Sequence, residues 1–309
     1  MSDQALFLLT GVGGGYSSIS RLVAERLLHS GASVRAMVHR DDGRADALRE
    51  LGADIVVGDL TRPDDVAAAL TGVTRMFFNM SVAADYLEAA AVVCSIAEEC
   101  GDLDALVNMS QMTVSQMTST STEESRHQRL HWLAERIMNW SGLPVVHVRP
   151  TVFLDNPLFT VVASHSVAER GILALPFGTG RTSPVAATDV ASVVATILQN
   201  PTGRAGHIYE LTGPAALNID GLAEQYTRGL GRPVTGSDLP DEDFAELMRS
   251  VPGISSHTVH HLLTVAKLHR DDRYNRLTTD VETVTGRPPQ SVEQYIAAHS
   301  EMFSKPAAH

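Results

Sequence analysis

The sequence predicts an α/β fold, in which a doubly wound parallel sheet is followed by a smaller, mostly helical C-terminal lobe. Two observations predict this class. Through the first 150 residues, short apolar runs alternate with helical patterns, and strands that alternate with crossover helices form a parallel sheet covered on both faces. A glycine run also follows the first apolar run directly, which is typical of a nucleotide-binding turn between a strand and a helix.

The predicted strands are short apolar runs, whereas the predicted helices carry apolar residues at helical spacing. We predict strands at 5–10, 33–39, 54–60, 75–80, 105–110, 145–150 and 207–213. We predict helices near 18–30, 43–51, 63–70, 84–100, 123–140, 157–170, 187–200 and 218–231. The stretch GILALPFGTGRTSP at 171–184 is rich in turn residues, and the chain after 231 is expected to be mostly helical.

Domain organisation follows from the same pattern. No linker rich in serine, glycine or proline interrupts the chain, and no internal repeat is visible. We therefore predict a dinucleotide-binding Rossmann core at 1–155 and a substrate lobe at 156–309, with 187–213 returning to the core.

Composition limits the class of protein. The 309 residues are 44% hydrophobic and carry a net charge of −12, which disfavours a nucleic-acid partner. No window is apolar enough for a transmembrane helix, and no basic region precedes the first apolar run, as it would in a signal peptide. We expect a cytoplasmic protein. Cys94 and Cys100 match no metal-binding or redox spacing and are expected to be reduced core residues.

The stretch GVGGGYSSIS at 11–20 carries the first chemical signal. A pyrophosphate needs backbone N–H groups at a helix N-terminus, and glycines let the chain approach it closely. The residues that supply this freedom are Gly11, Gly13, Gly14 and Gly15. A merely structural turn is the alternative, but the strand before it and the helix after it favour nucleotide binding.

Several stretches together resemble the NmrA-like branch of the atypical short-chain dehydrogenases/reductases, which includes quinone-reductase-like proteins. They are TGVGG at 10–14, VRAMVHR at 34–40, ADIVVGDLTRPDDVAAALTGV at 53–73, SGLPVVHVRPTVFLDN at 141–156 and YELTGP at 209–214. The match extends to TGRPPQSVEQYIAAH at 285–299. The resemblance implies a doubly wound fold and, in most members, NADP as cofactor.

The glycine loop of that family normally reads T-G-A-T-G-x-x-G, and this chain departs from it. Counting forward from Thr10 places the last glycine at Ser17, whereas counting back from the end of the helix places it at Ser20. The disagreement suggests an insertion. Because a serine can still donate a hydrogen bond to phosphate, we expect the loop to bind with Ser17 among its contacts; loss of binding is the alternative.

The end of the second strand decides between the two dinucleotides. NAD sites place an acid there, whereas NADP sites place an arginine. His39 and Arg40 stand at this point, with Arg35 nearby, so we predict NADP (NADPH) in preference to NAD; a solvated arginine is the alternative. The resemblance further implies contacts to the adenine from Asp59 and Leu60, and to the nicotinamide-ribose side from Asn79 and Ser81.

The proton relay of ordinary superfamily members is absent. Their carbonyl reductases use a tyrosine and a lysine four residues apart on one helix face, but here His127 holds the tyrosine position and His131 the lysine position. No lysine precedes Lys267. Either histidine would be a proton donor near neutral pH, or His131 would hold a ribose or substrate, or both are ordinary helix residues. The pair has no third ligand in a suitable context, so no metal is expected.

Further candidates follow the fifth and sixth strands, at the edge where ligands bind in open α/β sheets. Ser110 holds the place of the superfamily's active-site serine. The methionines around this point would form an adaptable apolar wall, and a glycine-rich loop near 177–182 would close over a substrate. The residues predicted to contact the substrate are Gln111, Met112, Phe153, Asn156, Phe177 and Arg181.

These observations favour an NADPH-dependent reductase of a quinone-like or conjugated small-molecule acceptor, because the reduced oxygen of such a product needs little acid catalysis. One alternative is a non-catalytic NADP-binding redox sensor that controls a protein partner. A third is a non-redox enzyme of specialised metabolism that has lost cofactor use. The expected partners are a small-molecule substrate and either a second copy of the chain or a regulatory protein, with no nucleic acid and no membrane.

Overall fold

The computed structural model describes residues 5–13, 18–81, 83–250 and 254–304. The chain forms two compact units, each assembled from three segments. Unit 1 contains Met1–Met117, His127–Arg149 and Ala187–Glu210, and unit 2 contains Thr118–Arg126, Pro150–Ala186 and Leu211–His309. The functional division into a cofactor-binding core and a substrate lobe stays a prediction.

Unit 1 is built on a seven-stranded sheet in the order β3-β2-β1-β4-β5-β6-β8. The chain starts in the middle of this sheet: Leu8 of β1 lies opposite Arg35 of β2 on one side and Met76 of β4 on the other, both in parallel register. The strands are β1 (Leu6–Leu9), β2 (Ser33–Val38), β3 (Asp54–Val57), β4 (Arg75–Phe78), β5 (Ala105–Met109), β6 (Val145–Pro150) and β8 (Ile208–Leu211). This order is that of a doubly wound fold, so the predicted fold class is confirmed.

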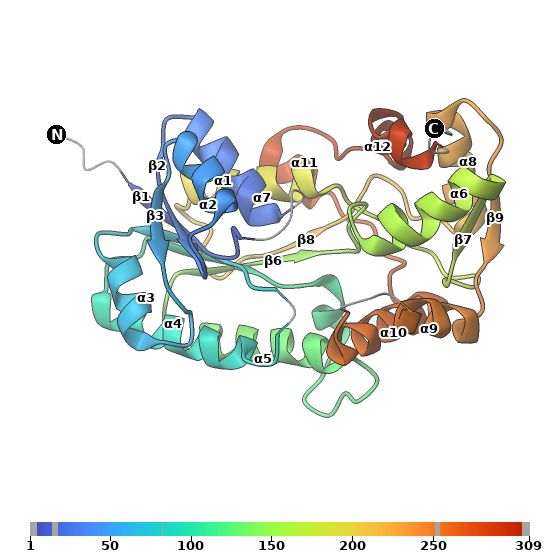
Figure 1. Ribbon diagram of the computed structural model, residues 1–309. Helices are drawn as coiled ribbons and strands as arrows, with labels where there is room; N and C mark the ends of the chain where they lie inside the picture. Colours follow the sequence, from blue (N-terminus) through green and yellow to red (C-terminus); the bar gives the residue numbers. More distant parts are fainter. Residues whose placement is uncertain (1–4, 14–17, 82, 251–253, 305–309) are drawn as a thin grey trace. The chain divides into compact units, whose positions relative to one another are not determined.

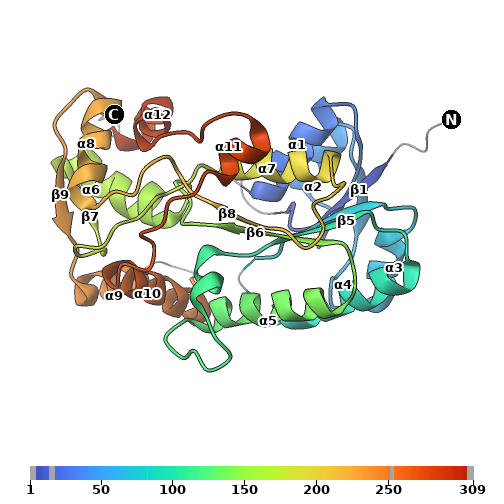
Figure 2. The ribbon, with the colours of Figure 1, turned by 180° about the vertical axis from the view of Figure 1, so that it is seen from behind.

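Helices cover both faces of this sheet, as a parallel sheet requires. Figure 1 shows α1, α2 and α7 on one face, and Figure 2 shows α4 and α5 against the other. The core between the sheet and α4 is apolar and contains the side chains of Phe78, Ala90 and Val93. The helices are α1 (Ile19–His29), α2 (Gly43–Glu50), α3 (Pro63–Leu70), α4 (Tyr86–Cys100), η1 (Met112–Gln116), α5 (Arg126–Trp140) and α7 (Ala187–Gln199).

The two cysteines do not share an environment. Cys94 is buried on the inner face of α4, as expected, but Cys100 is exposed at the last position of that helix. The expectation of a core position for Cys100 was therefore wrong. Because the apolar face of α4 ends at Ala97, a residue three positions later at the helix terminus lies outside the packed layer.

Unit 2 is mostly helical and contains one small sheet. Its helices are η2 (Leu158–Ala163, a π-helical turn), α6 (Ser164–Arg170), α8 (Ile219–Leu230), α9 (Asp241–Ser250), α10 (Ser256–Arg270), α11 (Asp280–Thr285), α12 (Val292–Ala298) and η3 (Ser300–Phe303). Its sheet pairs β7 (Ile172–Leu175) with β9 (Thr235–Asp238) in parallel. The prediction of a turn-rich segment at 171–184 was therefore wrong over β7.

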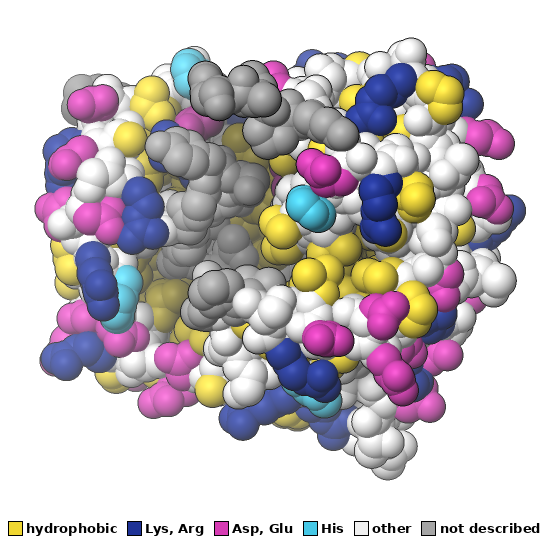
Figure 3. Space-filling view, turned by 45° about the vertical axis from the view of Figure 1, so that its right-hand side comes forward, with side chains coloured by type: hydrophobic (Ala, Val, Ile, Leu, Met, Phe, Trp, Pro, Cys, Tyr) yellow, Lys and Arg dark blue, Asp and Glu magenta, His cyan; other side chains and the backbone are white. Residues whose placement is uncertain are grey.

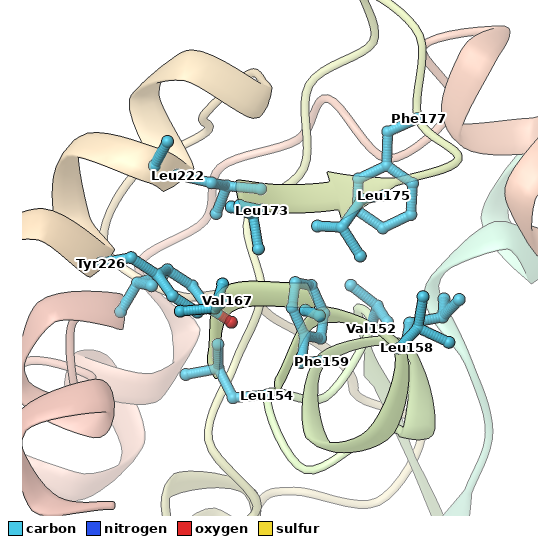
Figure 4. Close-up of a cluster of buried hydrophobic side chains, with 14 of the residues drawn as sticks. Val152, Leu154, Leu158, Phe159, Val167, Leu173, Leu175, Phe177, Leu222 and Tyr226 are labelled. Atoms are coloured by element: carbon cyan, nitrogen blue, oxygen red, sulfur yellow. The ribbon is translucent and has the colours of Figure 1, made fainter. Parts of the chain in front are cut away.

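The strand β7 is stabilised by the burial of its side chains in the core of unit 2. Leu173 and Leu175 are fully buried, and Figure 4 shows them facing the labelled side chains of α8, Leu222 and Tyr226, and of the η2–α6 region. Burial of this apolar surface stabilises the strand, although its partner β9 has the polar sequence TGSD.

The surface carries both signs of charge. Figure 3 shows cationic and anionic side chains interspersed over one face. Across the residues that the structure describes, no helix combines the length and apolarity needed to cross a membrane.

Candidate functional site

The glycine turn after β1 is shaped by one close contact. Gly11 has φ of +72°, and a Cβ atom at this position would lie 2.7 Å from the backbone oxygen of Asn79. Only glycine fits such a conformation and approach. The Ser18 hydroxyl, just before α1, donates a hydrogen bond to the Gly11 oxygen over 3.1 Å. The predicted contacts Gly14, Gly15 and Ser17 lie outside the described residues.

A cavity of about 420 Å³ opens beside this turn in unit 1, a volume in the range of small-molecule sites, about 300–1,000 Å³. The first four strands of the sheet all end at it. It brings together every described residue that was predicted to contact the cofactor: Gly11, Gly13, His39, Arg40, Asp59, Leu60, Asn79 and Ser81. Sequence reasoning missed the others in its lining: Thr10, Met37, Val38, Arg44, Gly58, Met80, Ala83 and Asp85.

The cations at the end of β2 differ in their partners. Arg40 is exposed and forms no ion pair with another described residue. Arg44, the second residue of α2, donates to the Asp42 carboxylate at 2.5 Å and to the Gly13 oxygen at 2.5 Å. Hydrogen bonds from Arg44 lower the pKa of Asp42 to about 2. Arg40 is therefore the cation in the cavity whose charge is not already compensated.

Arg35 was expected near the same point, and the structure corrects this. Its guanidinium donates to Asp54 at 2.7 Å and to the backbone oxygens of Ala69 and Thr71 at 3.0 and 2.7 Å. It does not line the cavity. Since a strand advances about 3.3 Å per residue, a side chain five residues before Arg40 lies about 16 Å away along the strand.

Asp59, at the end of β3, is fixed by its own loop. Its Oδ1 accepts hydrogen bonds from the Thr61 backbone N–H at 2.9 Å and from the Thr61 hydroxyl at 2.8 Å, and these bonds lower its pKa. A Cβ at Gly58 would lie 2.7 Å from the Met37 side chain. The carboxylate is thus held, charged, at the edge of the cavity.

The two histidines predicted to be catalytic are buried. His127 and His131 are each 6% exposed, and their Nε2 atoms lie 3.0 Å apart, so that one donates a hydrogen bond to the other. The His131 ring centroid is 4.5 Å from that of Tyr86, whose hydroxyl donates to the Met109 oxygen. Neither histidine lines the cavity described above, and their catalytic role stays a prediction.

Ser110, the third candidate, faces a buried polar network that sequence reasoning missed. Arg149 forms a bidentate ion pair with Glu135, in which its Nε and Nη2 donate to the two carboxylate oxygens at 2.9 and 2.5 Å. Its Nη1 lies 3.7 Å from the Glu210 Oε1. Burial raises the pKa of Glu135, but the hydrogen bonds from Arg149 and the nearby positive charge outweigh it, so the pKa lies below its usual value. The signal was available: polar residues alternate with apolar ones in the VVHVRP strand.

The predicted substrate residues divide between the units. In unit 1, Gln111 is half-buried and Met112 is fully buried. In unit 2, the Asn156 Oδ1 accepts a hydrogen bond from the Leu158 N–H at 2.9 Å, which fixes the turn before η2. Their contacts with a substrate stay a prediction.

The other substrate candidates in unit 2 also have structural contacts. Phe153 is half-buried and forms a bridge with Val185, and Phe177 is 1% exposed. Arg181 is exposed, while its backbone N–H donates to Asp272 at 2.8 Å. The segment that carries Phe177 and Arg181 is therefore anchored within unit 2, and its closure over a substrate stays a prediction.

The described residues offer no site for a metal ion. Among the residues that the structure covers, no group of three or more histidine, cysteine, aspartate or glutamate side chains is placed to hold a metal ion.

Comparison with known proteins gives the family. A family model described as NAD(P)H-binding matches residues 14–201. The chain is 26% identical over 292 residues to the NAD(P)H azoreductase of Xenophilus azovorans, a match that covers 94% of this chain and 97% of that protein.

Two solved structures share the fold. The NADPH-dependent quinone oxidoreductase from Escherichia coli, in complex with NADPH, matches with a TM-score of 0.80 and 20% identity over 94% of this chain and 99% of that one. NmrA, a negative transcriptional regulator in complex with NADP, matches with a TM-score of 0.78 and 17% identity over 96% and 95% of the two chains. Distant relatives of the chain are thus NAD(P)H-dependent oxidoreductases. The chain belongs to the NAD(P)H-binding family, and it shares its fold with NmrA.

Proposed function

We propose that this protein is an NADPH-dependent reductase of a quinone-like or conjugated small-molecule acceptor. One observation carries the proposal: the predicted cofactor contacts from four strand ends surround one cavity, with the uncompensated charge of Arg40 at its edge. The names of the relatives support the acceptor class, because azo compounds and quinones are both flat, conjugated electrophiles.

The residues of the cavity fit a phosphorylated dinucleotide. Gly11 has a positive φ in a tight turn directly after β1, which is where the fingerprint of dinucleotide sites uses its first glycine. Arg40, with Arg44 beside it, would hold a 2′-phosphate. Asp59 and Leu60 would face the adenosine, and Asn79 and Ser81 the nicotinamide ribose. When bound, the reduced dinucleotide supplies a hydride.

The chain then has two tasks: to bind the cofactor and the acceptor, and to orient them. An acceptor whose reduced oxygen or nitrogen anion is delocalised can take its proton from solvent, so a positioned acid is not needed for turnover. This agrees with the absence of a Tyr-x-x-x-Lys pair and with the burial of His127 and His131. His131, His127 and Ser110 stay candidates for the proton transfer.

The first experiment is a calorimetric titration of the purified protein with NADPH and, in parallel, with NADH. Micromolar binding that favours NADPH is expected, followed by oxidation of NADPH when 1,4-naphthoquinone or an azo dye is added. Binding without turnover over a broad acceptor panel would support the sensor instead. Absence of binding by either nucleotide would contradict both and leave the non-redox enzyme.

The sensor is the second candidate, and the fold that the chain shares with a transcriptional regulator favours it. The burial of the histidines does not separate the two candidates, because neither function requires a proton donor at the cavity. The sensor predicts tight NADP binding together with a change in oligomeric state or protein partner, which sedimentation with and without NADP would detect.

A further inference from the structure

Ser20 occupies a position in α1 where the family's glycine pattern, counted back from the helix end, expects a glycine. Its side chain is fully buried, and its Oγ accepts a hydrogen bond from the Asn79 side-chain Nδ2 over 2.9 Å. Asn79 lines the cavity, whereas Ser20 does not. The hydrogen bond to Asn79 is therefore a direct link from Ser20 to the lining of the cavity.

Asn79 is held at its backbone as well. Its N–H donates to the Thr10 hydroxyl oxygen at 3.0 Å, and the Thr10 hydroxyl donates to the Asn79 carbonyl at 2.9 Å. Gly11 closes the same corner, since a Cβ there would lie 2.7 Å from the Asn79 oxygen and 3.3 Å from the Ser20 Oγ. Backbone and side chain of Asn79 are thus both fixed by residues around the glycine turn.

The hydrogen bond of the Asn79 Nδ2 determines which side-chain atom of Asn79 remains for a ligand. Because Nδ2 donates to Ser20, the remaining polar atom of the side chain is Oδ1, which accepts hydrogen bonds and cannot donate them. The described residues offer this Oδ1 no hydrogen bond. A side chain that lines the cavity therefore keeps an acceptor for a hydroxyl group of a ligand.

We propose that Ser20 is a positioning residue, which orients the Asn79 amide so that its Oδ1 accepts from a hydroxyl of the ribose on the nicotinamide side of the dinucleotide. The inference rests on the proposed function, since it requires the dinucleotide in this cavity. This role would explain the departure from the glycine pattern, because a serine at this position can form a hydrogen bond to Asn79 and a glycine cannot. Restoring the glycine should then weaken binding.

The test compares two probes by calorimetry, NADPH and 2′,5′-ADP, which lacks the nicotinamide ribose. Ser20→Gly and Ser20→Ala are expected to weaken NADPH binding about 3- to 10-fold, as the loss of one net hydrogen bond does. Binding of 2′,5′-ADP should stay the same. Asn79→Ala should reproduce the selective loss, and Ser20→Gly combined with Asn79→Ala should add nothing to it.

Ser18→Ala is the matched control, because it removes a hydroxyl from the same helix start without touching Asn79. It should change the binding of both probes by the same factor. Ser20→Gly binding NADPH as tightly as the wild type, or more tightly, would overturn the proposal. An equal loss for both probes in Ser20→Ala would also overturn it, since that pattern indicates general damage to the turn.

A measurement without nucleotide tests the orientation of the Asn79 amide by Ser20 independently of the proposed function. The Asn79 side-chain amide signal in an ¹⁵N spectrum, assigned by its absence in Asn79→Asp, should shift and exchange faster with solvent in Ser20→Ala. An unchanged signal would show that Ser20 does not orient the amide. If the wild type binds neither NADPH nor NADH, the proposed function fails and the role toward the ribose fails with it. The amide signal then decides the orientation by itself.

Discussion

The imidazole of His269 stacks on the ring of Phe177, with centroids 3.9 Å apart and planes inclined by 7°. Tyr274 stacks on the opposite face, also at 3.9 Å. The His269 Nδ1–H donates to the Val265 oxygen at 2.8 Å, which leaves Nε2 to accept from the Thr182 hydroxyl at 3.3 Å. The ring is fully buried and neutral, and this burial lowers its pKa to about 3.

Stability should therefore fall in mild acid. Below its ordinary pKa of 6.5 the unfolded chain protonates this histidine, whereas the folded chain does so near 3; stability is lost as the pH falls through that interval, by up to about 1.4 kcal/mol per pH unit. His269→Phe keeps the stack and removes the titration. Urea unfolding at pH 7 and pH 5 should show a difference smaller by about 2 kcal/mol than in the wild type. An undiminished difference in His269→Phe would contradict the assignment.

Arg40 should decide cofactor preference. Its guanidinium lines the cavity without a described ion-pair partner, so Arg40→Gln is expected to weaken NADPH binding about tenfold, the effect of one charge-assisted bond to phosphate, and to leave NADH unaffected. Arg44→Gln is the matched variant and should cost less, because Asp42 already compensates its charge. Titration of both nucleotides into both variants measures this. An equal loss of NADH affinity in Arg40→Gln would place Arg40 away from the 2′-phosphate.

Asp42 should limit the affinity for NADPH. The carboxylate holds the Arg44 guanidinium and also accepts from the Arg44 backbone N–H as the cap of α2. Asp42→Asn keeps this cap, since asparagine is as good an N-cap as aspartate, but releases the charge of Arg44. Several-fold tighter NADPH binding with unchanged NADH binding is expected by calorimetry. A loss of NADPH affinity would mean that the ion pair itself shapes the site.

His131→Gln should retain most of the turnover. A general acid contributes about 100- to 10,000-fold, so a drop in kcat of about tenfold or more would restore His131 as the proton donor. Because the ring is buried against Tyr86 and His127, we expect less than that, with an unchanged pH profile of kcat/KM. His127→Gln is the companion variant, and steady-state oxidation of NADPH measures both.

Tyr226→Phe should be neutral or stabilising. The Tyr226 hydroxyl is fully buried among the apolar side chains of Figure 4 and has no hydrogen-bond partner in the described structure. Its removal should raise the free energy of unfolding by up to about 1 kcal/mol. Tyr295→Phe is the control, because that hydroxyl donates to Asp155 at 3.2 Å, and its loss should lower the free energy by about 1 kcal/mol. Chemical denaturation of both variants tests the contrast.

The local sequence pattern predicted the sheet of unit 1 and the cavity residues Gly11 and Arg40, because parallel topology brings the strand ends that carry them to one edge. Asp59 and Asn79 were added by the resemblance to the family. Arg44 was missed because it lies one turn into α2, where a helix surface usually faces solvent.

Features that depend on distant partners could not be predicted. The strand β7 pairs with TGSD about sixty residues later, and neither its length nor its partner's polarity signals a sheet. The Ser20–Asn79 bond joins residues 59 positions apart. The alternation in VVHVRP marks Arg149 as a polar residue of a strand, but its partners Glu135 and Glu210 lie on α5 and β8 and could not be assigned to it. Burial of polar groups is visible only when their partners are known.

The interleaving of the two units has a consequence for synthesis. Unit 1 needs its last segment, Ala187–Glu210, to supply α7 and the edge strand β8, yet the ribosome delivers Pro150–Ala186 of unit 2 before it. During that interval the nascent chain carries an unfinished sheet whose β6 edge is unpaired, and such edges are prone to pair with other chains. A fragment cut at residue 150 would keep the same open edge permanently, so a soluble minimal cofactor-binding fragment should require the 187–210 segment to be joined back by a short linker.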